Sequence, residues 1–255
     1  MNIYNKCWGR FIVLALIHFY MAGVFQNIAY ADSEEIVLAC NNFPPFKIEK
    51  PTEKMPGHDV EILIEIFKRM DQPLKIEYFP WKRALMMAKN GQVDGLCSCS
   101  HTKDREEFLY FSKTLGNIST GIFVLKENAP IQLTSFEEVS DEAFGVVDGY
   151  SLESTLEKAG VENISMPSND ESAIKMLRVK RFDFLYSFEA PVRYYMLKTG
   201  LSDQLVYKEF AKQDYFTCFS QDNQENAKLR DVFDKVLAEI KADGTYGAIL
   251  AKYRQ

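Results

Sequence analysis

Apolar and polar positions along the chain follow two periods, one typical of helices and one typical of strands. From residue 60 to residue 67 apolar side chains return every three or four positions, after Asp59, a good helix N-cap. Residues 74–78 instead alternate between apolar and charged side chains, which predicts a strand. Apolar runs at residues 36–39 and 144–147 are too short for helices and predict buried strands. Such segments alternate along the chain, which predicts an α/β architecture with mainly parallel sheets.

The stretch from residue 81 to residue 111 contains the most informative pattern. Its first part predicts a helix that Gly91 ends, with three residues facing inward: Leu85, Met86 and Ala88. The apolar run at residues 93–96 predicts a buried strand, and a polar loop of small residues and Thr102 follows it.

Asp104 and Arg105 then open another helical segment. Free backbone N–H groups at a helix start and a guanidinium together suit a carboxylate. The alternative is that Arg105 pairs with Asp104 or Glu106 on a solvated surface, where ion pairs contribute little. Composition alone favours this alternative.

An internal repeat suggests two lobes of similar build rather than one extended sheet. Residues 84–94 align without gaps on residues 173–183, and each copy reads as a helix, a basic turn and an aspartate before a strand. Residues 120–125 and 215–220 are rich in β-formers and are natural crossings between the lobes. The last segment places six apolar residues on one helical stripe that ends before Gly244: Leu229, Val232, Phe233, Val236, Leu237 and Ile240.

The N-terminal segment predicts export. Lys6 and Arg10 precede an apolar run that ends near residue 25, and Ala29-Tyr30-Ala31 has small residues where a signal peptidase reads. The run is short of the ~20 apolar residues that a membrane-spanning helix needs. We therefore expect a signal peptide at residues 1–31 and a periplasmic protein. The chain carries 30 basic and 36 acidic side chains, which argues against nucleic acid as a partner.

Four cysteines follow the predicted signal: Cys40, Cys97, Cys99 and Cys218. Cys97, Cys99 and His101 alternate along the chain and could ligate a metal, although a closed zinc site usually needs a fourth ligand. In an oxidising compartment a disulfide from Cys40 to Cys97 or Cys99 fits if the first and third strands are neighbours. Free buried thiols are the third alternative.

Several motifs occur together in an order that resembles the family 3 periplasmic solute-binding proteins, the polar amino-acid binders of ABC importers. The matching residues are Phe43-Pro44-Pro45-Phe46, Gly57-His58-Asp59, Trp81, Gly91, Asp94, Thr102, Arg105, Phe111-Ser112 and Asp243-Gly244-Thr245-Tyr246. The resemblance implies a type II periplasmic binding protein fold with two α/β lobes, each a mainly parallel sheet flanked by helices, joined by two hinge strands. It implies a discontinuous first lobe at residues 32–122 and 218–255 and a second lobe at residues 123–217, with the last long helix packed on the first lobe.

The resemblance also implies a ligand site. Arg105 would bind a ligand carboxylate, with hydroxyls and backbone N–H groups completing the anion site. Phe43 would lie over the ligand and Trp81 at the pocket edge, although both could be core aromatics. The hydroxyl residues of this site would be Ser98, Ser100 and Thr102, together with Ser151 of the second lobe, which could also be a plain N-cap.

The amino-group site departs from the family pattern. Phe188 stands where members usually have an aspartate, and Glu189 comes one residue later. Glu189 could bind an ammonium, or it could cap the helix that Pro191 begins. His58 replaces an aromatic residue of the family and reads as a lone exposed histidine.

The leading hypothesis is a binding protein, with no cofactor and no metal. It would be a monomer that closes over a small amino-acid-like or carboxylate ligand and delivers it to an ABC importer or a sensor. The alternative is an exported enzyme on the same fold, similar to cyclohexadienyl or arogenate dehydratases, with Glu189 and His101 as candidate acid and base. A third hypothesis is a lobe pair that has lost its ligand and binds a protein.

Overall fold

The structure is a computed structural model that describes residues 34–51, 55–130 and 133–253. The predicted signal peptide, residues 1–31, lies outside the described residues. The strands in these segments join in the order β2-β1-β3-β8-β4-β7-β5-β6. In chain order they are β1 (Ile36–Cys40), β2 (Leu74–Tyr78), β3 (Gly95–Ser100), β4 (Leu109–Leu125), β5 (Phe144–Gly145), β6 (Ile164–Ser165), β7 (Phe184–Phe188) and β8 (Leu205–Ser220).

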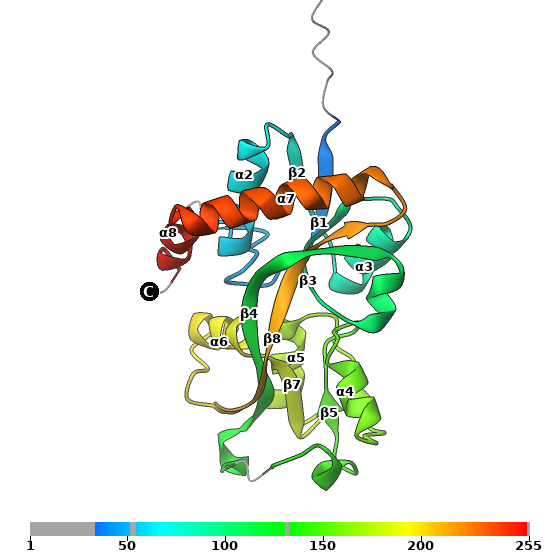
Figure 1. Cartoon of the computed structure of the whole chain (residues 1–255). Coiled ribbons are helices and arrows are strands. Elements are labelled where there is room, and N and C mark those ends of the chain that lie inside the picture. The colour runs from blue at the N-terminus through cyan, green and yellow to red at the C-terminus, as the bar shows by residue number, and fades with distance from the viewer. Residues whose placement is uncertain (1–33, 52–54, 131–132, 254–255) are drawn as a thin grey trace, which may run out of the picture. The chain divides into compact units, whose positions relative to one another are not determined.

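The elements group into two lobes around parallel strands (Figure 1). In the first lobe β1 pairs in parallel with β2 and β3. In the second lobe β5 pairs in parallel with β6 and β7. The helices of the first lobe are α2 (His58–Arg69), α3 (Trp81–Lys89), α7 (Glu225–Ala242) and α8 (Thr245–Ala251), and those of the second are α4 (Glu153–Lys158), α5 (Asp170–Arg178) and α6 (Glu189–Lys198).

The long antiparallel strands β4 and β8 run through both lobes. They connect the parallel strands of the two lobes into one hydrogen-bonded sheet. The pairing of β3 with β8 ends where Ser100 of β3 lies opposite Tyr215 of β8. On β4, β7 pairing begins at Thr120, opposite Phe188. Residues 117–119 and 212–214 therefore pair only with each other, as a two-stranded ribbon between the lobes.

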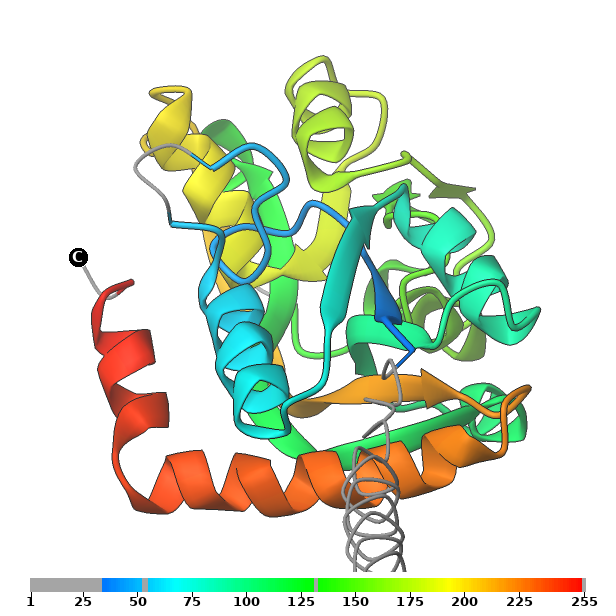
Figure 2. The ribbon, with the colours of Figure 1, turned by 90° about the horizontal axis from the view of Figure 1, so that it is seen from above.

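The last long helix packs on the first lobe (Figure 2). The Phe233 ring of α7 lies 6.1 Å from Phe67 of α2 and 5.4 Å from Phe219 of β8, centroid to centroid. Phe233, Val236, Leu237 and Ile240 of the predicted stripe are buried. Val232 is wrong as a member, because it is 43% exposed on the outer side of the helix. Gly244 follows the helix in the left-handed conformation, with φ 85°.

Three details near the site correct the sequence analysis. Gly57, with φ 104°, is the N-cap of α2, whereas the predicted N-cap Asp59 is a fully buried residue of the first turn. The polar residues 97–100 belong to β3 and not to a loop. Arg105 lies in a 3₁₀ turn, η1 (Lys103–Glu107), rather than at the start of an α-helix.

In helix α3 the inward position is confirmed for Ala88, which is buried, and for Leu85, which is partly buried against the core, but it is wrong for Met86. Met86 is 46% exposed, whereas Trp81, Ala84 and Ala88 are buried at helical spacing. Gly91 adopts φ 64° just past the helix, so its prediction as a helix stop is confirmed.

Two disulfides link the strands of the first lobe. Cys40 of β1 pairs with Cys97 of β3, and Cys99 of β3 pairs with Cys218 of β8. The predicted bond from Cys40 is confirmed, because β1 and β3 are neighbours. Both bonds occupy the thiols that the metal hypothesis needed, and the described segments hold no other group of ligands placed for a metal. Within the same residues, no helix is both long and apolar enough to cross a membrane.

Candidate functional site

A small cavity lies where the two lobes meet beside the carboxyl ends of β1 and β3. The space in which a water-sized sphere can be centred is about 50 Å³. Residues of both lobes line it: Asn41, Phe43, Phe46, Lys47, Trp81, Ser98, Cys99, Ser100, Arg105, Ile118, Tyr150, Ser151, Phe188 and Tyr215. Six of the eight residues predicted for the ligand site are among them, and the other two, Thr102 and Glu189, are not.

Arg105 is buried in this cavity, with 6% of its surface exposed. Its guanidinium lies 5.2 Å from the centre of the Trp81 ring and donates to the carbonyl oxygens of Ser100 (2.8 Å) and Gly149 (3.0 Å). Burial lowers the pKa of Arg105 to about 10, which Asp104 partly offsets, so the group stays charged at neutral pH. Surface pairing with Asp104 or Glu106 does not occur. Three of its five N–H donors remain for a ligand.

The Gly149 carbonyl connects the two lobes at this point. It accepts from Trp81 Nε1 (2.7 Å) as well as from Arg105. Gly149 has φ 77°, a left-handed conformation that glycine adopts at little cost. Next to it, Lys82 Nζ lies 2.9 Å from a carboxylate oxygen of Asp148. The lobes are therefore in direct contact around the guanidinium.

A short strap after β1, residues 43–47, carries a lysine into the cavity. Backbone hydrogen bonds in both directions between Phe43 and Lys47 (2.8 and 2.9 Å) fold the strap back on itself. Lys47 is 3% exposed, and its Nζ donates to Ser98 Oγ (2.8 Å) and lies 5.1 Å from the Phe43 ring centre. Gly57 fits against this strap because any Cβ there would lie 2.3 Å from the Phe46 carbonyl oxygen.

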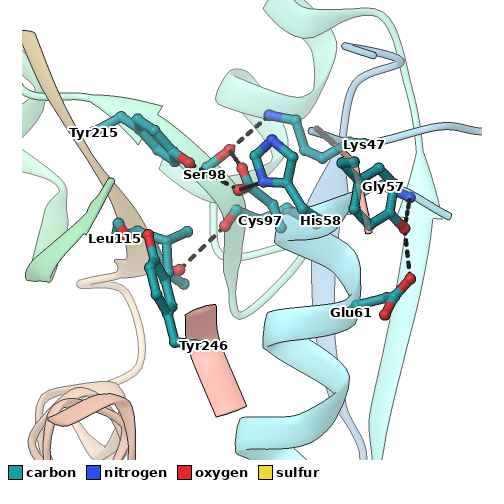
Figure 3. Close-up of polar contacts among 12 residues, drawn as sticks. Lys47, Gly57, His58, Glu61, Cys97, Ser98, Leu115, Tyr215 and Tyr246 are labelled. Atoms are coloured by element: carbon teal, nitrogen blue, oxygen red, sulfur yellow. Dashed lines mark hydrogen bonds and ion pairs between the residues drawn. The ribbon is translucent and has the colours of Figure 1, made fainter. Parts of the chain in front are cut away.

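Lys47, Ser98, His58 and Tyr215 meet in a buried polar network (Figure 3), and the carboxylate of Asp59 is at its centre. One carboxylate oxygen accepts from Ser98 Oγ (3.0 Å) and the other from the Tyr215 hydroxyl (2.9 Å). Burial lowers the pKa of Lys47 to about 8, and the attraction of Asp59 offsets this only in part. Burial and the adjacent carboxylate raise the pKa of Tyr215 well above its usual value.

His58 belongs to the same network, so its prediction as a lone exposed histidine is wrong. It is buried, and its Nδ1 lies 3.0 Å from a carboxylate oxygen of Asp59. Its ring packs against Phe46 (4.5 Å between centroids) and Tyr253 (5.6 Å). The first turn of α2 therefore supports the floor of the cavity.

Aromatic rings close the cavity on the side of the second lobe. Phe188 packs against Phe43 and Tyr150, with ring centroids 5.5 and 5.2 Å apart. Behind them, the carboxylate of Asp170 accepts from the Tyr150 hydroxyl (2.8 Å) and from Ser187 Oγ (2.9 Å). The residue at the family's aspartate position thus contributes a ring to the cavity and no charge.

The other three residues discussed for the ligand site are Ser151, Glu189 and Thr102, and their surroundings differ from one another. Ser151 Oγ is buried beside the cavity and has no hydrogen-bond partner among the described residues. Ser151 is not an N-cap, since α4 begins after Leu152. Glu189 opens α6 and pairs with Arg193 at 2.6 Å. Thr102 precedes η1 without a capping hydrogen bond from its side chain.

Sequence reasoning missed eight of the lining residues: Asn41, Phe46, Lys47, Cys99, Ile118, Tyr150, Phe188 and Tyr215. Two local signals were available: Phe46 and Lys47 end the segment that begins with Phe43, and Phe188 stands at the position of the amino-group aspartate. Tyr150 and Tyr215 reach the cavity through tertiary contacts that no local pattern records.

Two α/β lobes that meet over a cavity with a buried arginine define the class of two-lobed solute-binding proteins. Residues 36–255 match the model of the bacterial extracellular solute-binding proteins, family 3. The chain belongs to this family, and its fold is the type II periplasmic binding protein fold.

Individual relatives are distant in sequence. The "Probable amino-acid-binding protein YxeM" of Bacillus subtilis is 25% identical over 97% of this chain and 95% of its own. A histidine kinase sensor domain superposes with a TM-score of 0.79 at 21% identity, over 87% of this chain and 96% of its own. The arginine-, lysine-, histidine-binding protein ArtJ of Geobacillus stearothermophilus gives 0.75 at 19% identity, over 87% and 95%.

Proposed function

We propose that the protein captures a small amino-acid-like or carboxylate ligand between its lobes and delivers it to an ABC importer or a sensor. The observation that carries this proposal is Arg105, a buried guanidinium that lies on Trp81 in the cavity between the lobes. The relatives support it, because one is named as an amino-acid-binding protein and another is a sensor domain. A bidentate bond from arginine to a carboxylate is among the strong charge-assisted contacts.

Mass spectrometry of small molecules released by denaturing the purified protein tests this function. It is followed by calorimetric titration with a panel of the common amino acids and short carboxylates. We expect at least one member of this panel to bind to the wild-type protein. If no released molecule and no panel member binds, the proposal is wrong.

The contacts of the candidate acid and base favour binding over turnover. His101 Nε2 pairs with Glu106 at 2.7 Å on the surface, and Glu189 pairs with Arg193. Neither residue lines the cavity, although a general acid or base must reach its substrate. We propose that the protein is not an enzyme, and an assay with a prephenate-like substrate tests this.

Export is a further part of the proposal. If Ala29-Tyr30-Ala31 is a cleavage site, the mature protein begins at Asp32 and resides in the periplasm as a monomer. The intact mass of protein from the periplasmic fraction should equal that of residues 32–255. Retention of residues 1–31 in a membrane fraction would contradict export by cleavage.

The ribbon between the lobes predicts a hinge. Residues 117–119 and 212–214 pair only with each other, so they can bend without breaking the pairing within either lobe. We expect ligand to reduce the radius of gyration in small-angle scattering, because it favours closed lobes. An unchanged radius with a saturating ligand would count against hinge closure.

A further inference from the structure

We propose that the ligand is a short dicarboxylate without an ammonium group. One carboxylate would bind Arg105 and the other Lys47. This inference rests on the proposed function and specifies the ligand class of the same cavity. The family pattern indicates an amino-acid ligand, whereas the side chains of this cavity indicate a ligand with two negative charges and no ammonium group.

The cavity is lined by two cations and by no carboxylate among the described residues. The buried acids next to it, Asp59 and Asp170, have both carboxylate oxygens engaged by hydroxyl donors. An ammonium in the cavity would therefore meet no anion and would be repelled by Lys47 and Arg105. Two carboxylates would each meet a cation.

Lys47 has the geometry of a ligand-binding cation rather than of a satisfied ion pair. Its Nζ has a neutral acceptor, Ser98 Oγ, and no carboxylate of the described residues lies within ion-pair distance. The Ser98 hydroxyl lies between Lys47 and the carboxylate of Asp59. Asp59 therefore compensates the charge of Lys47 only in part. A buried charge without a full partner is costly, and a ligand carboxylate would remove that cost.

The aromatic wall does not form a cage for an ammonium. Phe188 packs directly on Phe43 and on Tyr150, so these rings fill the space between them. The faces of Phe43 and Trp81 already carry Lys47 and Arg105. Two rings of this group therefore already have a protein cation over one face, which makes a further cation there unfavourable.

A second cavity offers the strongest rival explanation. It shares Asn41, Trp81 and Tyr150 with the first, and its lining includes the carboxylates Glu49 and Glu171. An amino acid with a long cationic side chain could reach them past Trp81. The two cations of the first cavity, and the absence of a carboxylate from its lining among the described residues, favour a dianion instead.

Titration of the wild-type protein with matched ligands tests the proposal directly. Succinate and glutarate are compared with aspartate and glutamate, which add an ammonium, with butyrate, which lacks the second carboxylate, and with arginine. We expect succinate or glutarate to bind at least tenfold more tightly than its amino counterpart and than butyrate. If an amino acid binds as tightly as the dicarboxylates, this inference is wrong and the proposed function stands. If none of these ligands binds but another of the common amino acids or carboxylates does, only this inference is wrong. If none of them binds and denaturation releases no ligand, the proposed function is wrong as well.

The variant Lys47→Met, which keeps most of the apolar side chain and removes the ammonium, tests the second carboxylate site. We expect succinate or glutarate affinity to fall at least thirtyfold while butyrate affinity changes less than threefold. Lys68→Met, at an exposed position of α2, is the control. Equal losses for butyrate and dicarboxylate, with a lower Tm, would show that Lys47 only neutralises Asp59 and would overturn the proposal.

A pH series on the wild type gives a readout that does not depend on the folding of a variant. The protonated form of Lys47 binds the anion, so affinity should fall as pH rises through its pKa of about 8. The loss expected between pH 7 and 9 is about tenfold. The titratable and charged groups that face Lys47 from other elements are Asp59 and His58 on α2, Tyr215 on β8 and Arg105. A dicarboxylate affinity that stays constant from pH 7 to 9 would overturn the role of Lys47.

Discussion

Arg105→Ala should weaken the tightest ligand of the panel by about thirtyfold to several thousandfold. The guanidinium is buried against Trp81, so its bond to a carboxylate is shielded from water. Removing one partner of such a pair costs about 2–5 kcal/mol. Arg105→Lys should restore only part of this loss, because an ammonium cannot reproduce the planar fork. Calorimetric titration of the three proteins measures both effects.

The stability of the variant must be measured beside its affinity. Arg105 donates to carbonyls of Ser100 and Gly149, so its loss removes one contact between the lobes as well as the ligand contact. Trp81 still donates to Gly149, which limits the structural effect. Arg178→Ala, at an exposed arginine that bonds Gln204, is a matched control for the loss of a surface guanidinium. If Arg105→Ala binds within about threefold of the wild type, Arg105 is not the carboxylate site.

The parts of the fold with regular periodicity were predictable from the sequence. Strand β2 alternates and α2 has apolar side chains at helical spacing, so both were found at nearly their observed bounds. Strand β4 was predicted only from residue 120, although it begins at Leu109. Its pairing with β8 shifts register at three places between residues 111 and 121, and each shift interrupts the alternation that reveals a strand.

The residues of the candidate site also divide into those that could be predicted from the sequence and those that could not. Arg105 and Trp81 could be predicted because they stand in motifs with a fixed local order. Asp59 could not, because its role depends on Tyr215, which lies 156 positions away, and a buried acid at a helix start has the same local pattern as an N-cap. Lys47 was missed for a related reason. Its burial results from the folded strap and from Ser98 of another strand.

The cysteines show how the covalent framework supports this cavity. Cys99 lines it and is bonded to Cys218, so the bond connects the cavity wall on β3 to the long strand β8. Cys40 and Cys97 connect β1 to the same β3 strand. The strand ends that carry Ser98, Ser100 and the strap are thus fixed to their neighbours by covalent bonds. Such preorganisation reduces the ordering cost of binding.

Replacing Cys99 and Cys218 together by alanine should lower the free energy of unfolding by about 4–5 kcal/mol. This is the loop-entropy value for a cross-link between residues far apart, and these two are 119 positions apart. The pair Cys40 and Cys97, 57 positions apart, should cost about 0.6 kcal/mol less when replaced in the same way, because the closed loop is half as long. Urea unfolding of the mature protein and of both double variants measures the difference.

Ligand affinity should also distinguish the effects of losing the two disulfides. Cys99 lines the cavity directly, whereas Cys97 does not, so the loss of the Cys99 bond should weaken ligand binding more. Titration at a temperature well below both unfolding transitions makes this comparison independent of stability. Thiol labelling of the denatured, unreduced mature protein is the control, because two intact disulfides leave no reactive thiol among the four cysteines. Labelling of all four in protein taken from the periplasm would contradict the covalent framework, and unfolding energies unchanged by either double substitution would contradict its role in stability.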